Sequence, residues 1–169
     1  MRDYAMRGLV CGILLGVLLL AGTQPALAQA KADVFAGGSF VRDNSATFSG
    51  WNASVTGNMR SWLGLTADFG GNYHSPLKIY TYTFGPRLAF AQDSSLVPFT
   101  QATFGVARLS ALGAHANGFA AYLGGGMDWY ATDHIGVRLI QLDAQLTRVS
   151  GNNSSATRIA FGVVFRLGS

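Results

Sequence analysis

The chain has 169 residues, of which 49% are hydrophobic and 12% are charged, and its formal net charge is +4. A charged fraction of about half the average for soluble domains, together with 22 glycines and 12% aromatics, argues against intrinsic disorder. All acidic residues are Asp, which disfavours a helical bundle because helix surfaces rely on Glu. The basic residues are scattered singly, which argues against a nucleic-acid-binding protein.

Residues 1–28 have the three parts of a secretory signal peptide. Two arginines precede an apolar run over residues 8–22, and small residues follow at Ala26 and Ala28. The run is shorter than the roughly 20 residues that a helix needs to span a bilayer, so a membrane anchor is disfavoured. We expect cleavage after Ala28, which leaves one exported domain over 29–169 without a cysteine.

The rest of the sequence alternates bulky apolar residues with small or polar ones, in runs of about ten residues that are typical of membrane β-strands. No segment after the signal approaches a transmembrane helix, so entry into a membrane would require a closed barrel. The expected strands cover residues 33–41, 50–59, 63–73, 79–91, 96–109, 118–130, 135–148 and 157–167.

Two of these runs contain an irregularity. In 79–91, Pro86 cannot donate a hydrogen bond to a neighbouring strand, which predicts a bulge or an irregular pair there. In 135–148 the alternation loses its phase, because Arg138 and Asp143 cannot both face inward in a regular strand. One extra residue near Ile140 would reconcile them, so we predict a β-bulge at that point.

The composition of the two faces predicts their orientation. The polar face is rich in Gly, Ala, Ser and Thr, which suit a narrow interior, whereas a solvated face would carry many Lys and Glu. The apolar face is therefore expected to meet lipid. The sequence predicts an all-β, eight-stranded antiparallel up-and-down transmembrane barrel. The alternative is a secreted soluble barrel of the lipocalin type, with its apolar face turned inward around a ligand.

The connections are expected to alternate in length. Short turns are predicted at 58–61, 92–95 and 131–134, and generally longer segments rich in Asn, Ser and Gly at 42–49, 74–78, 111–117 and 150–156. Short periplasmic turns and longer outer loops are typical of outer-membrane barrels.

Aromatic residues then form two girdles, one at each rim of the predicted barrel. The predicted girdle residues are Trp62, Phe90, Phe99, Trp129 and Tyr130 near the periplasmic rim, and Phe40, Trp51, Tyr73, Tyr80 and Phe119 near the outer rim, with Phe165 as a further candidate.

Charged residues on the inward face would fill the lumen. An eight-stranded barrel has an interior just wide enough for side chains, and confined charges must be paired or hydrated. We therefore expect a structural network of ion pairs in place of an open pore, with a proton or ion path as the alternative. The predicted interior charges are Asp68, Arg87, Asp128, Arg138, Asp143, Arg158 and Arg166.

The histidines carry no recognisable catalytic or metal pattern. His74 and His115 fall in predicted outer loops and His134 in a periplasmic turn, and no third ligand stands at metal spacing. Ser110 precedes His115, but that loop has no Asp to orient the imidazole. We expect no catalytic, metal or cofactor site. A lipid-directed outer-membrane hydrolase or acyltransferase that uses His115 is the remaining alternative.

Three segments resemble the outer-membrane β-barrel domain family, the OmpA, OmpX and opacity-like group. They are the fourth-strand Gly-Pro-Arg pattern in 82–88, the Gly-rich segment 124–129 with the Asp-His-Ile-Gly-Val-Arg-Leu of 133–139, and the closing strand 161–168. One departure is the ending Leu-Gly-Ser, which leaves Phe165 as the nearest aromatic to the terminus.

The resemblance covers nearly all of 29–169 and implies an outer-membrane β-barrel domain. It implies location in the bacterial outer membrane, insertion by the barrel-assembly machinery, contact with membrane lipid and lipopolysaccharide, and a monomer. A weakly basic rim could attract anionic lipopolysaccharide at the outer end. Its residues are Arg42, His74, Lys78 and Arg108.

Overall fold

The computed structural model describes residues 32–43, 46–75, 77–91, 94–111, 114–149 and 152–168. The expected signal peptide and its cleavage site lie outside these residues. Within the described ranges, no helix is both long enough and apolar enough to cross a membrane.

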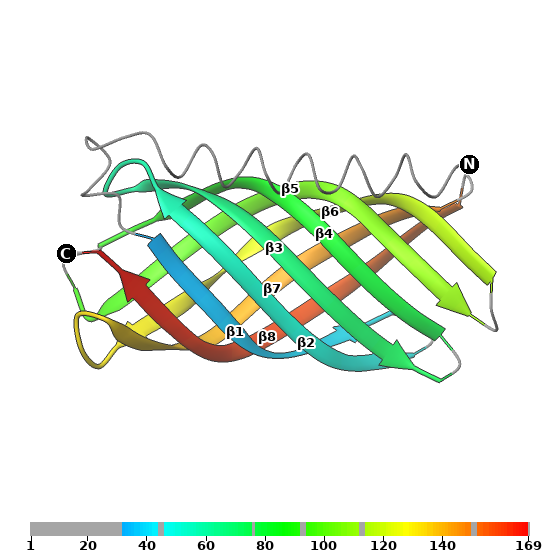
Figure 1. Cartoon of the computed structure of the whole chain (residues 1–169), viewed down its shortest axis with the longest axis horizontal. Coiled ribbons are helices and arrows are strands. Elements are labelled where there is room, and N and C mark those ends of the chain that lie inside the picture. The colour runs from blue at the N-terminus through cyan, green and yellow to red at the C-terminus, as the bar shows by residue number, and fades with distance from the viewer. Residues whose placement is uncertain are drawn as a thin grey trace, which may run out of the picture. The chain divides into compact units, whose positions relative to one another are not determined.

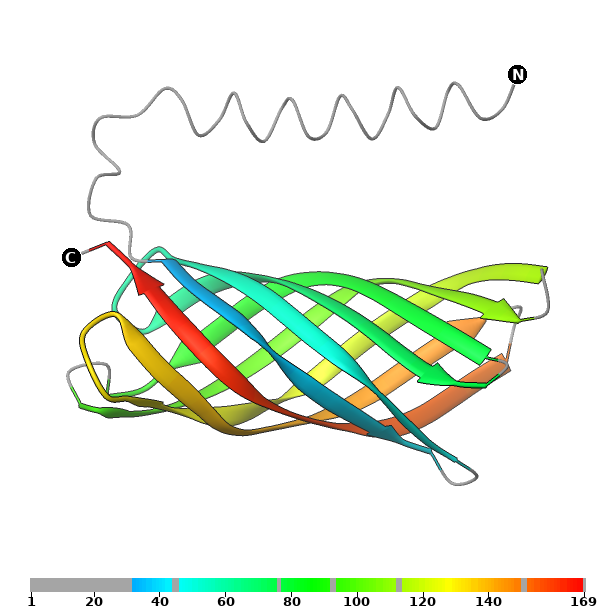
Figure 2. The ribbon, with the colours of Figure 1, turned by 60° about the horizontal axis from the view of Figure 1, so that its bottom comes forward.

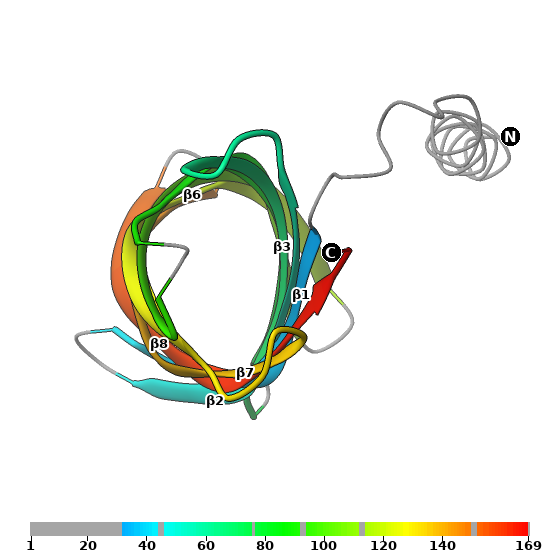
Figure 3. The same ribbon diagram turned by 90° about the vertical axis from the view of Figure 1, so that its left-hand side faces the viewer.

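Eight antiparallel strands form a closed barrel, in which each strand pairs with the next and β8 pairs with β1 (Figures 1 and 3). This confirms the predicted eight-stranded up-and-down barrel. All strands are inclined to the barrel axis, as barrel closure requires (Figure 2). The strands are β1 Ala32–Arg42, β2 Thr47–Asn58, β3 Leu63–His74, β4 Leu77–Ala89, β5 Leu96–Ala111, β6 Ala114–Tyr130, β7 Ile135–Val149 and β8 Asn152–Leu167.

The apolar side chains point away from the lumen. In β4, Tyr82 and Phe84 are more than half exposed, whereas Thr83 and Arg87 are buried. Phe161 on β8 is likewise exposed. The lipocalin-like alternative is therefore wrong, because that class of barrel encloses its apolar face.

The predicted bulge in β7 is confirmed. The register of β7 against both neighbours shifts after Arg138, and the next two residues, Leu139 and Ile140, are both exposed. The inserted residue lets Arg138 and Asp143 face the lumen together.

Pro86 behaves differently from a bulge. The described β4–β5 pairs resume at Arg87 in the register they held at Phe84, so the ladder is interrupted without a shift. Pro86 still lies opposite Leu65 of β3. The missing hydrogen-bond donor of proline is thus accommodated by leaving out pairs on one side of the strand.

The barrel has two ends, which we call the terminal end and the distal end. The terminal end carries the start of β1, the last residues of β8 and the connections 59–62 and 131–134. The distal end carries the last residues of β1, β3, β5 and β7 and the first residues of β2, β4, β6 and β8.

The prediction of longer connections at the distal end was wrong. The ladders continue to Ala111 opposite Ala114 and to Val149 opposite Asn152. The sequence predicts loops in these segments because Ser and Asn favour turns. The same side chains also fit a strand whose surface is exposed to water. Only the pairing with a neighbouring strand therefore distinguishes a strand from a loop in these segments.

Two glycines allow the closing pair of strands to approach each other. Gly37 of β1 lies opposite Gly162 of β8. A Cβ atom on Gly162 would collide with the carbonyl oxygen of Ala36 and with the Cα of Gly37. The pairing of β1 with β8 thus depends on the absence of side chains at Gly37 and Gly162.

We expect Gly162→Val to prevent stable closure of the barrel, because the new side chain would displace β1 backbone atoms. Refolding into detergent micelles, followed by the heat-dependent mobility shift on gels, measures the closed fraction. Gly57→Val is the matched control, because an added Cβ there meets no atom within 4 Å. A closed fraction for Gly162→Val equal to that of the control would contradict the prediction.

Candidate functional site

The middle of the lumen holds a group of buried charged side chains, which we call the central ion network. Each member is at most 3% exposed. The members are Asp68 on β3, Arg87 on β4, Asp128 on β6, Arg138 and Asp143 on β7, and Arg158 on β8.

Arg158 links two carboxylates that come from different strands. Its Nη1 lies 2.7 Å from Oδ1 of Asp68, and its Nη2 lies 2.8 Å from Oδ2 of Asp143. Asn52 of β2 donates a hydrogen bond of 3.1 Å to Asp68, and Gln101 of β5 donates one of 3.3 Å to Asp143. The guanidinium and both carboxylates are thus satisfied within the lumen.

Asp128 forms the centre of the second half of the network. Its Oδ2 accepts a hydrogen bond of 2.6 Å from Arg87, and its Oδ1 accepts one of 2.7 Å from Nε of Arg138. A second bond from Arg138, of 3.0 Å, makes that pair bidentate. One carboxylate therefore compensates two guanidinium groups, and this geometry provides both strength and fixed orientation.

Gln141 connects the two halves. Its Oε1 accepts a bond of 2.6 Å from Arg138, and its Nε2 donates one of 2.7 Å to Asp143. The network is therefore continuous from Asp68 to Arg87, and its three carboxylates balance its three guanidinium groups. Charge balance matters because an uncompensated ion in such a narrow interior is strongly unfavourable.

Aromatic rings cover the guanidinium planes. The Cζ of Arg87 lies 3.8 Å from the centroid of the Phe99 ring, and Arg138 lies over both Phe35 and Phe99. Arg158 lies 4.1 Å from the centroid of Tyr122. These cation–π contacts fill the remaining space around the ions with apolar atoms.

The prediction that Phe99 belongs to the periplasmic girdle was wrong, because its side chain is 2% exposed and points inward.

Arg166 forms a separate cluster at the terminal end. Its Nε lies 3.2 Å from Oδ1 of Asp33, and Oδ2 of the same carboxylate accepts a hydrogen bond from Asn58. The ring of Tyr130 stacks over the Arg166 guanidinium at 3.8 Å. The structure thus separates Arg166 from the other six predicted interior charges. It also adds Asp33, which is not among the predicted interior charges although the alternation of β1 places it on the lumen face.

Tyr130 was wrongly placed in the girdle, since its side chain is 7% exposed and lies inside the barrel. It has the same phase on β6 as Asp128, which already faced inward in the prediction. The other predicted girdle residues are exposed or half-buried on the outer face. They are Trp62, Phe90, Trp129 and Phe165 near the terminal end, and Phe40, Trp51, Tyr73, Tyr80 and Phe119 toward the distal end.

Ser110 and His115 come together at the distal end, where β5 turns into β6. Ser110 Oγ lies 2.7 Å from Nδ1 of His115, and both residues are at least partly exposed. Among the described residues no carboxylate contacts His115 in an ion pair or hydrogen bond. Nor does the described part of the chain contain a group of three His, Cys, Asp or Glu side chains able to hold a metal ion.

We expect Asp128→Ala to lower the free energy of unfolding by about 3–5 kcal/mol, because it leaves Arg87 and Arg138 buried without a counter-ion. Denaturant titration in micelles measures this change. The matched control is Asp133→Ala in the exposed 131–134 connection, where a change below about 0.5 kcal/mol is expected. Equal losses in the two variants would show that the ion pairs of Asp128 contribute nothing specific.

No protein-family model and no curated protein matches the sequence. Among solved structures, Neisserial surface protein A is 16% identical, with a TM-score of 0.62 over 81% of this chain and 96% of that protein. The N-terminal β-barrel domain of Pseudomonas aeruginosa OprF is 13% identical, with a TM-score of 0.61 over 82% and 98%. Ail, the attachment invasion locus protein of Yersinia pestis, is 14% identical, with a TM-score of 0.54 over 82% and 99%. This chain therefore has the fold of the small eight-stranded outer-membrane β-barrels.

Proposed function

We propose that this protein is an integral β-barrel of the bacterial outer membrane that has a structural or surface-interaction role and a closed lumen. The observation that carries this proposal is that the apolar face of the sheet points outward and the charged face points into the lumen, which is opposite to the arrangement in a soluble barrel. Bulky apolar side chains face outward on every strand, while three Asp and three Arg side chains, joined by four ion pairs, are buried inside.

The outer face supports a location in lipid. It exposes large apolar residues around the whole barrel, from Phe40 on β1 to Phe165 on β8. Soluble monomers rarely expose continuous apolar patches of more than a few hundred Å². Aromatic side chains near both ends match the two interfaces of a bilayer, where rings with a polar edge are favoured. One example is Trp51, whose Nε1 donates to the hydroxyl of Tyr73 at 3.2 Å.

The interior supports a lumen that has no open pore. The central ion network and its aromatic covers occupy the middle of the lumen, and every guanidinium in it is engaged by a carboxylate. A permeating ion would have to break these pairs, which is costly in a narrow interior. This favours a structural role for the network over a proton or ion path.

The termini would lie in the periplasm, and the distal end would face the cell exterior. The barrel-assembly machinery would insert the chain, with Phe165 as the aromatic residue nearest its end, and the product would be a monomer. Lipopolysaccharide is the expected surface partner, because Arg42, Lys78 and Arg108 are exposed around the distal end together with His74.

Two measurements test this function. The exported protein should sediment with outer membranes and show heat-dependent gel mobility, and in planar bilayers it should produce no ion-conducting steps. Recovery as a freely soluble periplasmic protein would contradict the membrane location. Stable conductance steps from the purified barrel would contradict the closed lumen while leaving the membrane location intact.

Neutralising the basic rim should weaken lipopolysaccharide binding, because phosphate groups lose their counter-charges. We expect a variant with Arg42, His74, Lys78 and Arg108 all changed to Gln to bind lipopolysaccharide vesicles several-fold more weakly than the wild type, with a reduced dependence on salt. Arg60→Gln, in a terminal-end turn, is the control. Unchanged binding by the fourfold variant would remove the rim from the proposal.

A further inference from the structure

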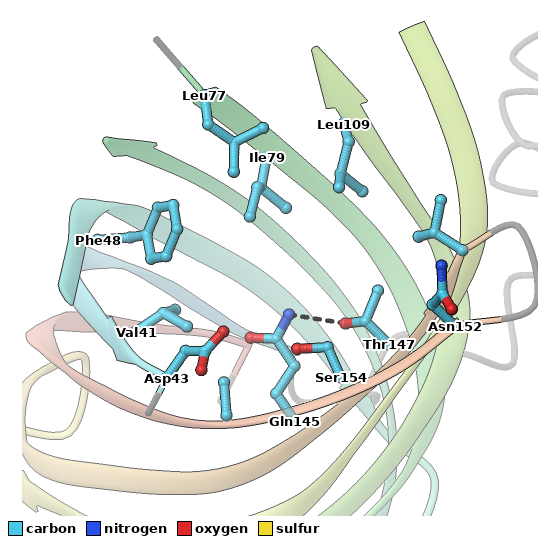
Figure 4. A pocket seen from close by; sticks show the side chains of 12 residues that line it. Val41, Asp43, Phe48, Leu77, Ile79, Leu109, Gln145, Thr147, Asn152 and Ser154 are labelled. Carbon is cyan, nitrogen blue, oxygen red and sulfur yellow. Dashed lines mark hydrogen bonds between the residues drawn. The ribbon is translucent and has the colours of Figure 1, made fainter. Parts of the chain in front are cut away.

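The lumen is hollow at its distal mouth, above the central ion network. This hollow, which we call the distal cup, has a volume of about 440 Å³ and opens toward the distal end (Figure 4). Its volume lies within the range of small-molecule sites, roughly 300–1,000 Å³. Its lining includes Asp43, Leu77, Ile79, Leu109, Gln145 and Ser154.

The cup has an apolar wall and a polar wall. Leu77 and Ile79 of β4, with Leu109 of β5, face Gln145 and Ser154 across the hollow (Figure 4). The three aliphatic side chains are only half-buried. In an open mouth they would meet water, so an apolar ligand that covers them gains the free energy of burial.

The polar wall carries the amide of Gln145 and the carboxylate of Asp43. Gln145 is 6% exposed, and its Nε2 donates to Thr147 at 3.1 Å, whereas its Oε1 is buried and has no hydrogen bond. That oxygen points toward the carboxylate of Asp43 (Figure 4). Because the amide oxygen has no accessible surface, the half-buried carboxylate of Asp43 is the acceptor that a ligand in the cup can reach, and a cationic donor suits it best.

We propose that the distal cup binds a small amphiphilic amine. The apolar body, a single ring or a short branched alkyl group, would pack on Leu77, Ile79 and Leu109. The ammonium group would donate hydrogen bonds to the carboxylate of Asp43. A carboxylate head would meet the like charge of Asp43, and a wholly apolar ligand would leave that carboxylate without a counter-charge. This site is independent of the proposed surface role and of lipopolysaccharide binding at the rim.

Isoleucine methyl groups give a direct readout of occupancy. Outside the expected signal the chain has four isoleucines, of which Ile79 lines the cup and Ile135, Ile140 and Ile159 are exposed on the outer face. Selective labelling of the Ile δ1 methyl groups, with the barrel in lipid nanodiscs, reports both environments in one spectrum. The outer-face methyl groups then serve as internal controls for partition of the probe into lipid.

The probes are 2-phenylethylamine, 2-phenylethanol and 3-phenylpropionate, which share a ring and differ in the polar head. We expect the Ile79 shift to saturate with the amine, while the outer-face methyl groups respond linearly. The amine should bind at least about tenfold more tightly than the propionate, which corresponds to one charge-assisted hydrogen bond. A linear Ile79 response, or equal affinity for the amine and the propionate, would overturn the proposal.

Variants locate the binding groups. Asp43→Asn, which lies outside the strands, should weaken amine binding about tenfold and leave the binding of the alcohol unchanged. Leu109→Trp should fill the cup and abolish the saturable shift, whereas Leu123→Trp on the outer face should not. Gel mobility verifies that each variant is closed. Amine affinity that is unchanged in closed Asp43→Asn would overturn the proposed role of the carboxylate, and with it the preference for amines.

Discussion

The pairing of β8 with β1 is the constraint on which the rest of this structure depends. It satisfies the backbone groups that would otherwise form two open edges, and only a sheet without edges is stable in lipid. Closure also divides the side chains into two sets, because alternate residues must face either the lumen or the surroundings. The facing glycines Gly37 and Gly162 show how little room remains where the two end strands meet.

A narrow closed lumen then determines how charge can be accommodated. The guanidinium of Arg158 lies between two carboxylates, and the carboxylate of Asp128 lies between two guanidinium groups. The halves are complementary in charge, and Gln141 joins them as both acceptor and donor. Such a network is costly to assemble from water, but it is much more costly to leave incomplete, so it favours one register of the strands over its alternatives.

Polarity changes along the axis of the barrel. Asp33 and Arg166 lie at the terminal end, the central ion network fills the middle, and aliphatic side chains such as Ile79 and Leu109 surround the hollow distal mouth. The filled part supports the closed lumen, and the hollow part is where a ligand finds space. The distal end therefore combines a basic outer rim with an amphipathic cup, two surfaces suited to different chemical groups.

Much of this arrangement follows from the order of residues alone, because a strand places alternate side chains on opposite faces. Period-two alternation was sufficient to predict eight strands, the inward charges and the bulge near Ile140. The same rule, applied consistently, would also have placed Phe99 and Tyr130 inside, since they share the phase of Gln101 and Asp128.

Tertiary structure decided what alternation cannot encode. Which carboxylate meets Arg158, how far β5 and β6 continue toward Ala111 and Ala114, and the approach of Ser110 to His115 depend on the register between strands. The distal cup likewise requires side chains from both sides of the barrel to converge. Local sequence specifies the face on which a side chain lies, whereas closure of the sheet specifies its neighbours across the lumen.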